Sequence, residues 1–236
     1  MNFNNSINSD ELTTKIKKKL IANGASIVGI GNLAILSDSN YPLPVIEGFR
    51  FAISIGIKLS DKIIDELIDG PTKEYAQHYS EINSKLDNLA NNLVKFLNEL
   101  GFHSIAIEAS KVMDKVTHRA NFPHKTAAIL SGIGWIGKSN LLITHVYGPR
   151  VRLVTILTDA PLIADQPQRE SNCGSCQECV DICPVKCLSG KLWEFGDSRE
   201  KLYDVEKCSD FVHKQEKIVG KPICGLCIRV CPYGQS

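Results

Sequence analysis

The residues best able to do chemistry are nine cysteines, and all of them lie from Cys173 onward. Four form a run spaced by two, two and three residues and followed by a proline: Cys173, Cys176, Cys179 and Cys183. In bacterial ferredoxins, three thiolates at this spacing hold one iron–sulfur cube and the fourth binds a second cube. The run therefore predicts iron–sulfur clusters and one-electron transfer.

A second, shorter run of cysteines, also followed by a proline, lies near the end of the sequence and lacks one upstream ligand, which Cys208 is well placed to supply. Exchanging the last cysteine of each run gives two sets of four. We predict a first [4Fe–4S] cluster on Cys173, Cys176, Cys179 and Cys231, and a second on Cys183, Cys208, Cys224 and Cys227. The ninth cysteine, Cys187, is interpreted as a small buried residue near the second cluster, and a ligand of that cluster is the alternative.

Zinc ions and disulfides are the alternatives for these cysteines. Two zinc ions could use eight thiolates, and zinc ribbons contain cysteine pairs with the same short spacing. Cysteines confined to one end of a chain would staple only part of a fold, which is unusual for a disulfide scaffold. The spacing of the two runs, each followed by a proline, is more typical of iron–sulfur proteins.

The composition of the chain indicates where in the cell this chemistry would take place and which partners it disfavours. The first ten residues are polar, with no signal peptide, and no apolar run has the length of a membrane span. We therefore expect a cytoplasmic protein without membrane contact. The formal net charge of +1 does not favour nucleic-acid binding through bulk electrostatics.

The elements that must position the cysteines are predicted from the apolar pattern. Spacings of three and four predict helices over 10–23, 74–100 and 124–131. Short apolar runs predict strands over 25–30, 51–57, 103–107, 141–144 and 151–158. We expect an α/β (α+β) N-terminal domain over residues 1–165 and a C-terminal ferredoxin-like double [4Fe–4S] module over 166–236, divided at a polar stretch.

A glycine-rich segment over 132–139 (GIGWIGKS) fits both the phosphate loop and the dinucleotide fingerprint. Both patterns need a strand before the loop and a helix after it, whereas here a helical segment precedes and an extended one follows. Trp135 and its apolar neighbour are also bulky for a loop that wraps phosphates. Two interpretations remain open: a tight turn that a large flat ligand approaches closely, and a structural turn with Trp135 in the core.

In and after the glycine-rich segment, the chain resembles the epoxyqueuosine reductases and the related reductive dehalogenases. The resemblance rests on residues 132–140 (GIGWIGKSN), 148–153 (GPRVRL) and 157–162 (LTDAPL), followed by the double-cluster module. It implies a cobalamin between the two domains that is reduced through the clusters, and it leaves tRNA open as a substrate. The cofactor contacts that it implies are Gly132, Gly134, Trp135, Gly137, Lys138, Ser139 and Arg150.

Three residues before the glycine-rich segment are candidates for catalysis. His118 occupies the position where the resemblance implies a catalytic aspartate. His124 could donate a proton near neutral pH, or it could simply cap a helix. Lys125 could hold an anionic group, or it could be a solvated side chain.

Three functions follow from these observations. The first is an iron–sulfur oxidoreductase that passes electrons from a donor such as ferredoxin or flavodoxin, through two clusters, to a cobalamin or substrate in the N-terminal domain. The second is an electron-transfer protein that reductively activates a separate corrinoid protein. The third is a ferredoxin fused to a binding domain.

Overall fold

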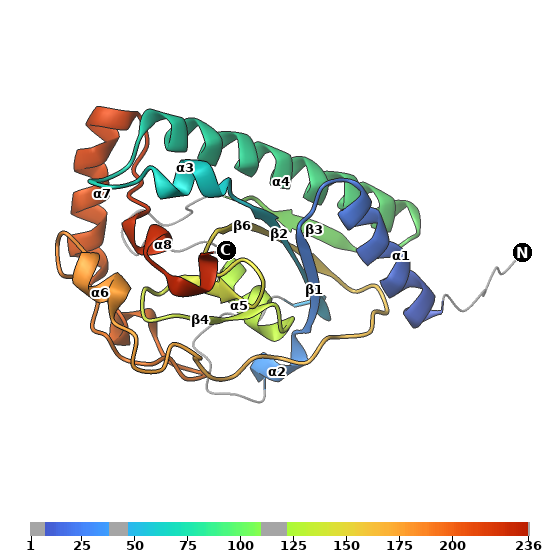
Figure 1. Cartoon of the computed structure of the whole chain (residues 1–236). Coiled ribbons are helices and arrows are strands. Elements are labelled where there is room, and N and C mark those ends of the chain that lie inside the picture. Colours follow the sequence, from blue (N-terminus) through green and yellow to red (C-terminus); the bar gives the residue numbers. More distant parts are fainter. Residues whose placement is uncertain (1–7, 38–46, 110–121, 236) are drawn as a thin grey trace, which may run out of the picture.

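A computed structural model of the chain describes residues 8–37, 47–109 and 122–235. Its centre is a four-stranded sheet in the order β1 (Ile27–Asn32), β2 (Phe51–Lys58), β6 (Val151–Thr158) and β3 (Ser104–Ile107). All three pairs of neighbouring strands are antiparallel. Helices and strands alternate along the chain, but the sheet is antiparallel, so the domain belongs to the α+β class (Figure 1). The predicted α/β (α+β) fold class is confirmed.

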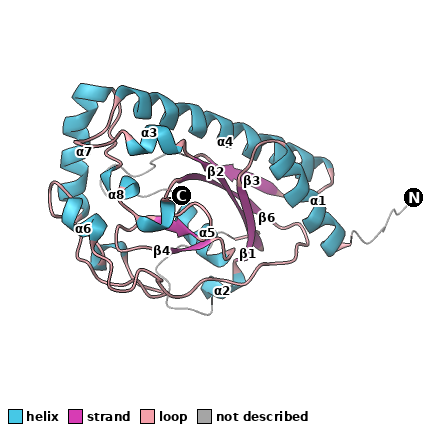
Figure 2. Ribbon diagram, viewed as in Figure 1, coloured by secondary structure: helices cyan, strands magenta, loops and turns pink. Residues whose placement is uncertain are grey.

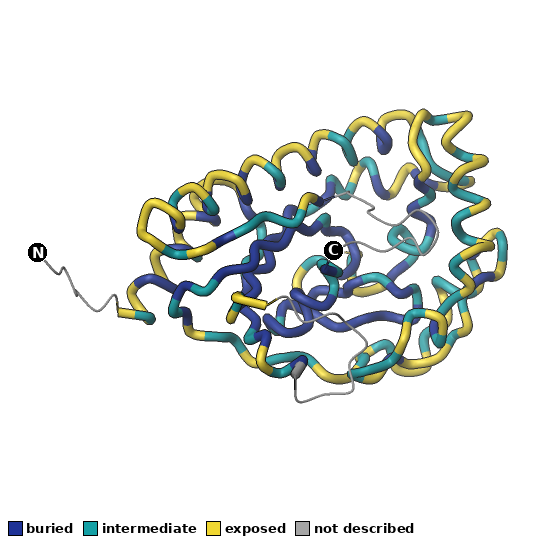
Figure 3. Tube along the Cα trace, turned by 180° about the vertical axis from the view of Figure 1, so that it is seen from behind, coloured by how far each residue is buried: buried dark blue, intermediate teal, exposed yellow. Residues whose placement is uncertain are grey.

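Helices cover both faces of this sheet, which explains why its strands are apolar throughout rather than alternating. Helix α4 (Lys73–Glu99) and helix α1 (Ser9–Ala22) lie over one face, where Ile53 and Ile55 join the same hydrophobic cluster as Leu86. Helix α5 (His124–Leu130) lies against the other face, where Ala52 packs with Leu130. Figure 2 shows α4 running over the strands of the sheet. The outward side of α4 is exposed while the strands beneath it are buried (Figure 3).

Three short elements extend this core. Helices α2 (Ala34–Ser37) and α3 (Asp61–Asp65) follow β1 and β2 in the chain. A separate two-stranded sheet joins β4 (Gly134–Ile136) to β5 (Leu142–Thr144). The sequence predicted the large elements of the N-terminal domain to within a few residues, but β4 was hidden inside the glycine-rich segment and α7 of the C-terminal module was not predicted.

The C-terminal module consists of short helices and irregular segments. Its helices are α6 (Glu178–Ile182), α7 (Val205–Val219) and α8 (Leu226–Arg229), with single 3-10 turns at Arg199–Lys201 and Pro232–Gly234. In Figure 1 these helices gather at one end of α4. Trp193 and Leu202 of the module share a hydrophobic cluster with Ile129 of α5, so the module packs onto the larger domain.

Within residues 8–37, 47–109 and 122–235, no helix combines the length and the apolar character that crossing a membrane requires.

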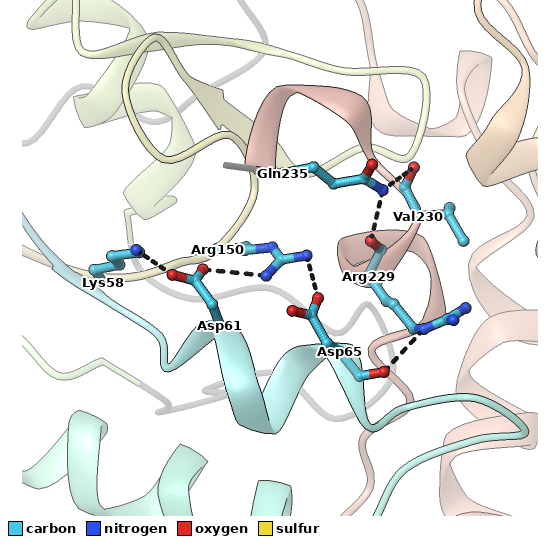
Figure 4. A network of polar contacts seen from close by, with 7 residues as sticks. All are labelled: Lys58, Asp61, Asp65, Arg150, Arg229, Val230 and Gln235. Atoms are coloured by element: carbon cyan, nitrogen blue, oxygen red, sulfur yellow. Dashed lines mark hydrogen bonds and ion pairs between the residues drawn. The ribbon is translucent and has the colours of Figure 1, made fainter.

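The side chain of Arg150, next to β6, pairs with helix α3, which is also bonded to the C-terminal module (Figure 4). Its guanidinium is 2% exposed and pairs with Asp61 at 3.1 Å and Asp65 at 2.6 Å, both on α3. The carbonyl oxygen of Asp65 accepts a hydrogen bond from Arg229 Nε at 3.2 Å. Bonds to Lys58 and Arg150 lower the pKa of Asp61, so its stabilising contribution is present above the ordinary aspartate value and is lost as the pH falls through the lowered pKa.

Replacement of Arg150 by alanine is expected to lower the thermal midpoint of the isolated protein by about 5–10 °C. The reason is the loss of two charge-assisted hydrogen bonds from a buried group, about 2–3 kcal/mol in a chain of this length. Circular dichroism at a fixed scan rate measures this midpoint. The control is Lys58→Ala, which removes a partly exposed partner of Asp61 and costs about 1 kcal/mol or less. Equal midpoints for the two variants would contradict the structural role of Arg150.

Candidate metal centre

All nine cysteines are free thiols, and they gather around two cavities in the module. The smaller cavity, about 20 Å³, is lined by the four cysteines that the sequence predicted for the first cluster: Cys173, Cys176, Cys179 and Cys231. The larger, about 230 Å³, is lined by the four predicted for the second: Cys183, Cys208, Cys224 and Cys227. Cys187 lines the larger cavity as well, and Cys227 lines both.

The exchange of one cysteine between the runs follows from the packing of two short helices. Cys179 lies in α6 and Cys183 directly follows that helix. Cys227 lies in α8, and Cys231 comes two residues after it. Because α6 and α8 contact each other, the last cysteine of each run reaches the cavity of the other run. Cys208 joins the second set from α7.

The donor set fits iron–sulfur clusters. Four thiols of each predicted set line one cavity, and an iron–sulfide cube takes four thiolate ligands. Burial and neighbouring thiols raise the pKa of Cys179 and of Cys231 to about 11, so iron must displace a proton from each.

Each cavity also has a lysine from the larger domain at its wall. Lys138 is 3% exposed and donates from Nζ to the Cys176 carbonyl oxygen at 2.8 Å beside the first set. Lys125 lines the second cavity and donates from Nζ to the Asn140 carbonyl oxygen. Burial, and to a smaller degree Arg199, lowers the pKa of Lys125 to about 8. Two cations beside the thiols would oppose the negative charge of thiolate-bound clusters.

The glycine-rich segment packs against the chain itself and against the first thiol set. A Cβ at Gly134 would lie 2.1 Å from the Ile143 carbonyl oxygen, and one at Gly132, where φ is +64°, would lie 2.2 Å from the Gln166 carbonyl oxygen. Trp135 is 1% exposed and stacks edge-on against Tyr233, with ring centroids 4.8 Å apart. The helix precedes this segment and β4 lies within it, so neither phosphate-binding pattern has the strand and helix that it requires.

The remaining cofactor contacts implied by the resemblance lie in the same region. A Cβ at Gly137 would lie 3.4 Å from the Cys173 sulfur, and Ser139 lines both cavities. Arg150 is occupied by the carboxylates shown in Figure 4. Contact of Gly132, Gly134, Trp135, Gly137, Lys138, Ser139 and Arg150 with a cobalamin stays a prediction.

Among the catalytic candidates, His124 is held as a neutral ring. Its Nε2 lies 3.1 Å from the Glu108 carbonyl oxygen, which can only accept, so Nε2 carries the proton. Its Nδ1 lies 2.9 Å from Thr155 Oγ1 and accepts from that hydroxyl. Burial lowers the pKa of His124 to about 4, which favours a structural role near neutral pH. Its role as proton donor stays a prediction, and His118 lies outside the described residues.

Two residues, Tyr75 and Gly225, pack beside the second thiol set without lining its cavity. Tyr75 of α4 is 2% exposed, and it lies close enough to Cys224 and Cys227 for their charges to affect its pKa, which burial raises. Gly225, between these two cysteines, has φ +91° and packs against Tyr75 and Leu67. A glycine inside a cysteine pair is the only sequence feature that could have pointed to this contact.

Replacement of Gly225 by alanine is expected to reduce the iron held at the second site. The added Cβ would lie 2.6 Å from Leu67 Cδ1 and 2.9 Å from Tyr75 Cε1, and the left-handed backbone adds about 1–2 kcal/mol of strain. The matched control is Gly174→Ala, between two cysteines of the first set, where φ is +52° and nothing lies within 4 Å. Iron analysis after anaerobic reconstitution should show a loss for Gly225→Ala and little for Gly174→Ala; equal contents would contradict the steric argument.

Comparison with known proteins finds one matching family model and several similar sequences. Residues 172–234 match the model of the 4Fe-4S double cluster binding domain. The chain is 31% identical over 121 residues to an epoxyqueuosine reductase of Cyclobacterium marinum, a match that covers 46% of this chain and 36% of that protein. It is 34% identical over 113 residues to an epoxyqueuosine reductase of Synechococcus sp. strain RCC307, covering 44% of this chain and 32% of the relative. The matches thus span about a third of these relatives' length.

Solved structures share the fold over nearly the whole chain. A reductive dehalogenase described with a mechanism for B12-dependent dehalogenation has a TM-score of 0.77 at 18% identity, covering 99% of this chain and 33% of that one. An epoxyqueuosine reductase with a tRNA-Tyr stem loop has a TM-score of 0.60 at 17% identity, covering 95% of this chain and 65% of that one. The chain is thus similar in sequence to the epoxyqueuosine reductases of Cyclobacterium marinum and Synechococcus over less than half of its length, and residues 172–234 match the 4Fe-4S double cluster binding domain.

Proposed function

We propose that this chain is an iron–sulfur reductase in which two [4Fe–4S] clusters pass electrons from a donor protein to an acceptor held by the α+β domain. The acceptor is a cobalamin or the substrate itself. The observation that carries the proposal is that Cys227 lines both thiol cavities. Ser139 lines both cavities as well, so the two cavities adjoin and the two clusters would lie close enough to exchange electrons directly.

The surroundings of the two sets support a direction for the electrons. The loop that carries the first set is exposed at Gly174, Ser175 and Gln177, which makes it accessible to a donor such as ferredoxin or flavodoxin. The second set meets the α4 side of the larger domain, since Gly225 packs on Tyr75. We therefore assign electron input to the first cluster and output to the second.

A series of side-chain contacts connects Tyr75, beside the second set, with Arg152 in strand β6 of the sheet. The rings of Tyr75 and Tyr79 meet edge to face with centroids 6.3 Å apart. The guanidinium of Arg152 lies 4.1 Å from the Tyr79 centroid, and its Nε donates to Asn83 at 3.0 Å. These contacts connect the surroundings of the second set with Arg152 of β6.

The protein's own residues would set the environment of the clusters. Each cluster, when bound, gains and loses one electron at a time. Lys138 and Lys125 would hold positive charge beside the first and second clusters, which favours their reduced, more negative states. The apolar packing of Trp135, Ile143 and Cys231 would keep water from one side of the first cluster.

A corrinoid has weaker support than the clusters. It is favoured by the fold shared with the B12-dependent dehalogenase. The described residues assigned to it by resemblance, however, pack within the chain or line the thiol cavities. We therefore route no reaction step through a corrinoid. RNA also stays open as a substrate, because a related structure carries a tRNA stem loop, although the net charge of +1 gives it no general electrostatic support.

One observation favours the second function, an electron-transfer protein that activates a separate corrinoid protein. The polar groups of His124 are both satisfied inside the chain, by Thr155 and by Glu108, and the guanidinium of Arg152 is bonded to Tyr79 and Asn83. Groups held in this way position structure more readily than they bind a substrate. On this alternative the electrons would leave the second cluster for a partner protein.

Anaerobic reconstitution with iron, sulfide and hydroxocobalamin, followed by gel filtration, tests the proposal. The reductase predicts two reducible clusters and a corrinoid or substrate that the clusters reduce within the same chain. Two clusters that reduce only the cobalt of a separate corrinoid protein would support the alternative. A reconstituted chain without iron and sulfide would overturn both.

A further inference from the structure

The second cavity has more thiols than one cluster needs. An iron–sulfide cube takes four protein ligands, yet five cysteines line this space. The additional one is Cys187, which is 6% exposed and whose Sγ lies 3.5 Å from Cys183 Sγ. The first cavity has no comparable surplus, because the fifth cysteine at its wall, Cys227, is needed by the second set.

The backbone holds Cys187 in this place independently of any cluster. The chain turns back after Cys183 through Lys186, which has φ +46°, and the Lys186 amide donates to the Cys183 carbonyl oxygen at 3.2 Å. A non-glycine residue in this left-handed region costs about 1–2 kcal/mol, so the surrounding structure must stabilise the turn. The Cys187 carbonyl oxygen accepts from the Asp204 amide at 2.9 Å, on the segment that leads into α7 and Cys208.

We propose that Cys187 is a reserve ligand of the second cluster, which binds the iron atom that Cys183 otherwise binds whenever the Cys183 thiolate is lost. The inference rests on the proposed function, since it requires a cluster in the second cavity. The step conserves electrons: the Cys187 thiol releases its proton to solvent, and its thiolate forms the Fe–S bond that Cys183 no longer makes. The charge of the ligand set is unchanged, because one thiolate replaces another.

Geometry explains why Cys187 and Cys183 are the interchangeable pair. The two sulfurs are in van der Waals contact, so an iron bound to one lies within reach of the other after a change of side-chain rotamer. No backbone shift is needed, because residues 183–188 are fixed by the turn and by the bridge between Leu188 and Tyr203. The second site would therefore tolerate loss of Cys183, whereas the first site has no thiol to replace Cys179.

Three variants test the proposal: Cys183→Ala, Cys187→Ala and the double variant. Each is reconstituted anaerobically with iron and sulfide, and its iron content is measured beside that of the unmodified chain. Both single variants are expected to keep the full iron content, and the double variant to keep half. Cys183→Ala should also show altered g-values for one cluster in the reduced protein, because the ligand rotamer differs.

Several outcomes would overturn the proposal. One is a Cys183→Ala variant with the same halved iron content as the double variant, and another is the three-iron signal of a cluster with an unbound corner. A halved content in Cys187→Ala would make Cys187 the normal ligand rather than a reserve. Retention of the first cluster's signal in every variant shows that the chain has folded. Absence of iron and sulfide from the unmodified chain is the separate failure of the proposed function.

Discussion

Replacement of Cys179 by alanine is expected to halve the iron bound by the anaerobically reconstituted chain. Cys179 lies in α6 and lines the first cavity with Cys173, Cys176 and Cys231. Its removal leaves one corner of the first cube without a thiolate, and no surplus cysteine lies at that cavity. The second set does not include Cys179, so its cluster should remain. Reduction of the acceptor by a donor protein should stop, because electrons enter through the first cluster.

Iron and sulfide analysis measures this loss, and EPR of the reduced protein identifies the cluster that remains. The control is Ser175→Ala, an exposed position in the same loop that should leave both clusters in place. Unchanged iron in Cys179→Ala would remove this residue from the ligand set. Loss of all iron would show that the two sites assemble as a single unit rather than as separate cubes.

The second large effect is expected from pairs of cysteine substitutions. The variant with both Cys179 and Cys231 replaced by alanine should keep the same half of the iron as Cys179→Ala alone. The variant with Cys179 and Cys227 replaced should bind none. The reason is the crossing of the runs: Cys231 lines the first cavity although it follows α8, whereas Cys227 in α8 serves the second.

These double variants separate crossed from uncrossed ligand sets by iron content alone. If each run held its own cluster, Cys231 and Cys227 would belong together, and the two double variants would lose equal amounts of iron. If Cys227 belonged to the first set, which its position at both cavities allows, Cys179→Ala with Cys227→Ala would keep half. Either result would contradict the assignment proposed here.

The gathering of the cysteines could be predicted from the sequence because the double-cluster pattern depends on local spacing. The short helices α6 and α8 each carry one run and contact each other, which brings the two runs together. The assignment of each cysteine to one cluster stays a prediction. Cys208 could be identified because it stands upstream of the incomplete run. The fold class and the large helices and strands were predictable too, since long apolar periodicities such as that of α4 dominate there.

The surroundings of the sets were not predictable, because they depend on contacts between distant segments. The glycines of 132–137 fit several ligand-binding patterns, and only the approach of the Ile143 and Gln166 carbonyls shows that the chain itself fills the space. From the sequence alone, His124 is a candidate proton donor. In the structure, its two ring nitrogens are hydrogen-bonded to Thr155 and to the Glu108 carbonyl oxygen. Helix α7 was not predicted, although Val205, Val212 and Val219 lie on one half-buried face of it.

The most direct test of the central claim is a metal analysis of the anaerobically isolated chain combined with EPR of its reduced form. Two adjacent cubes predict eight iron and eight sulfide per chain. They also predict a spectrum broadened by interaction between the reduced clusters, which simplifies to a single-cluster spectrum in Cys179→Ala. Zinc in place of iron, or thiols joined as disulfides, would contradict the account.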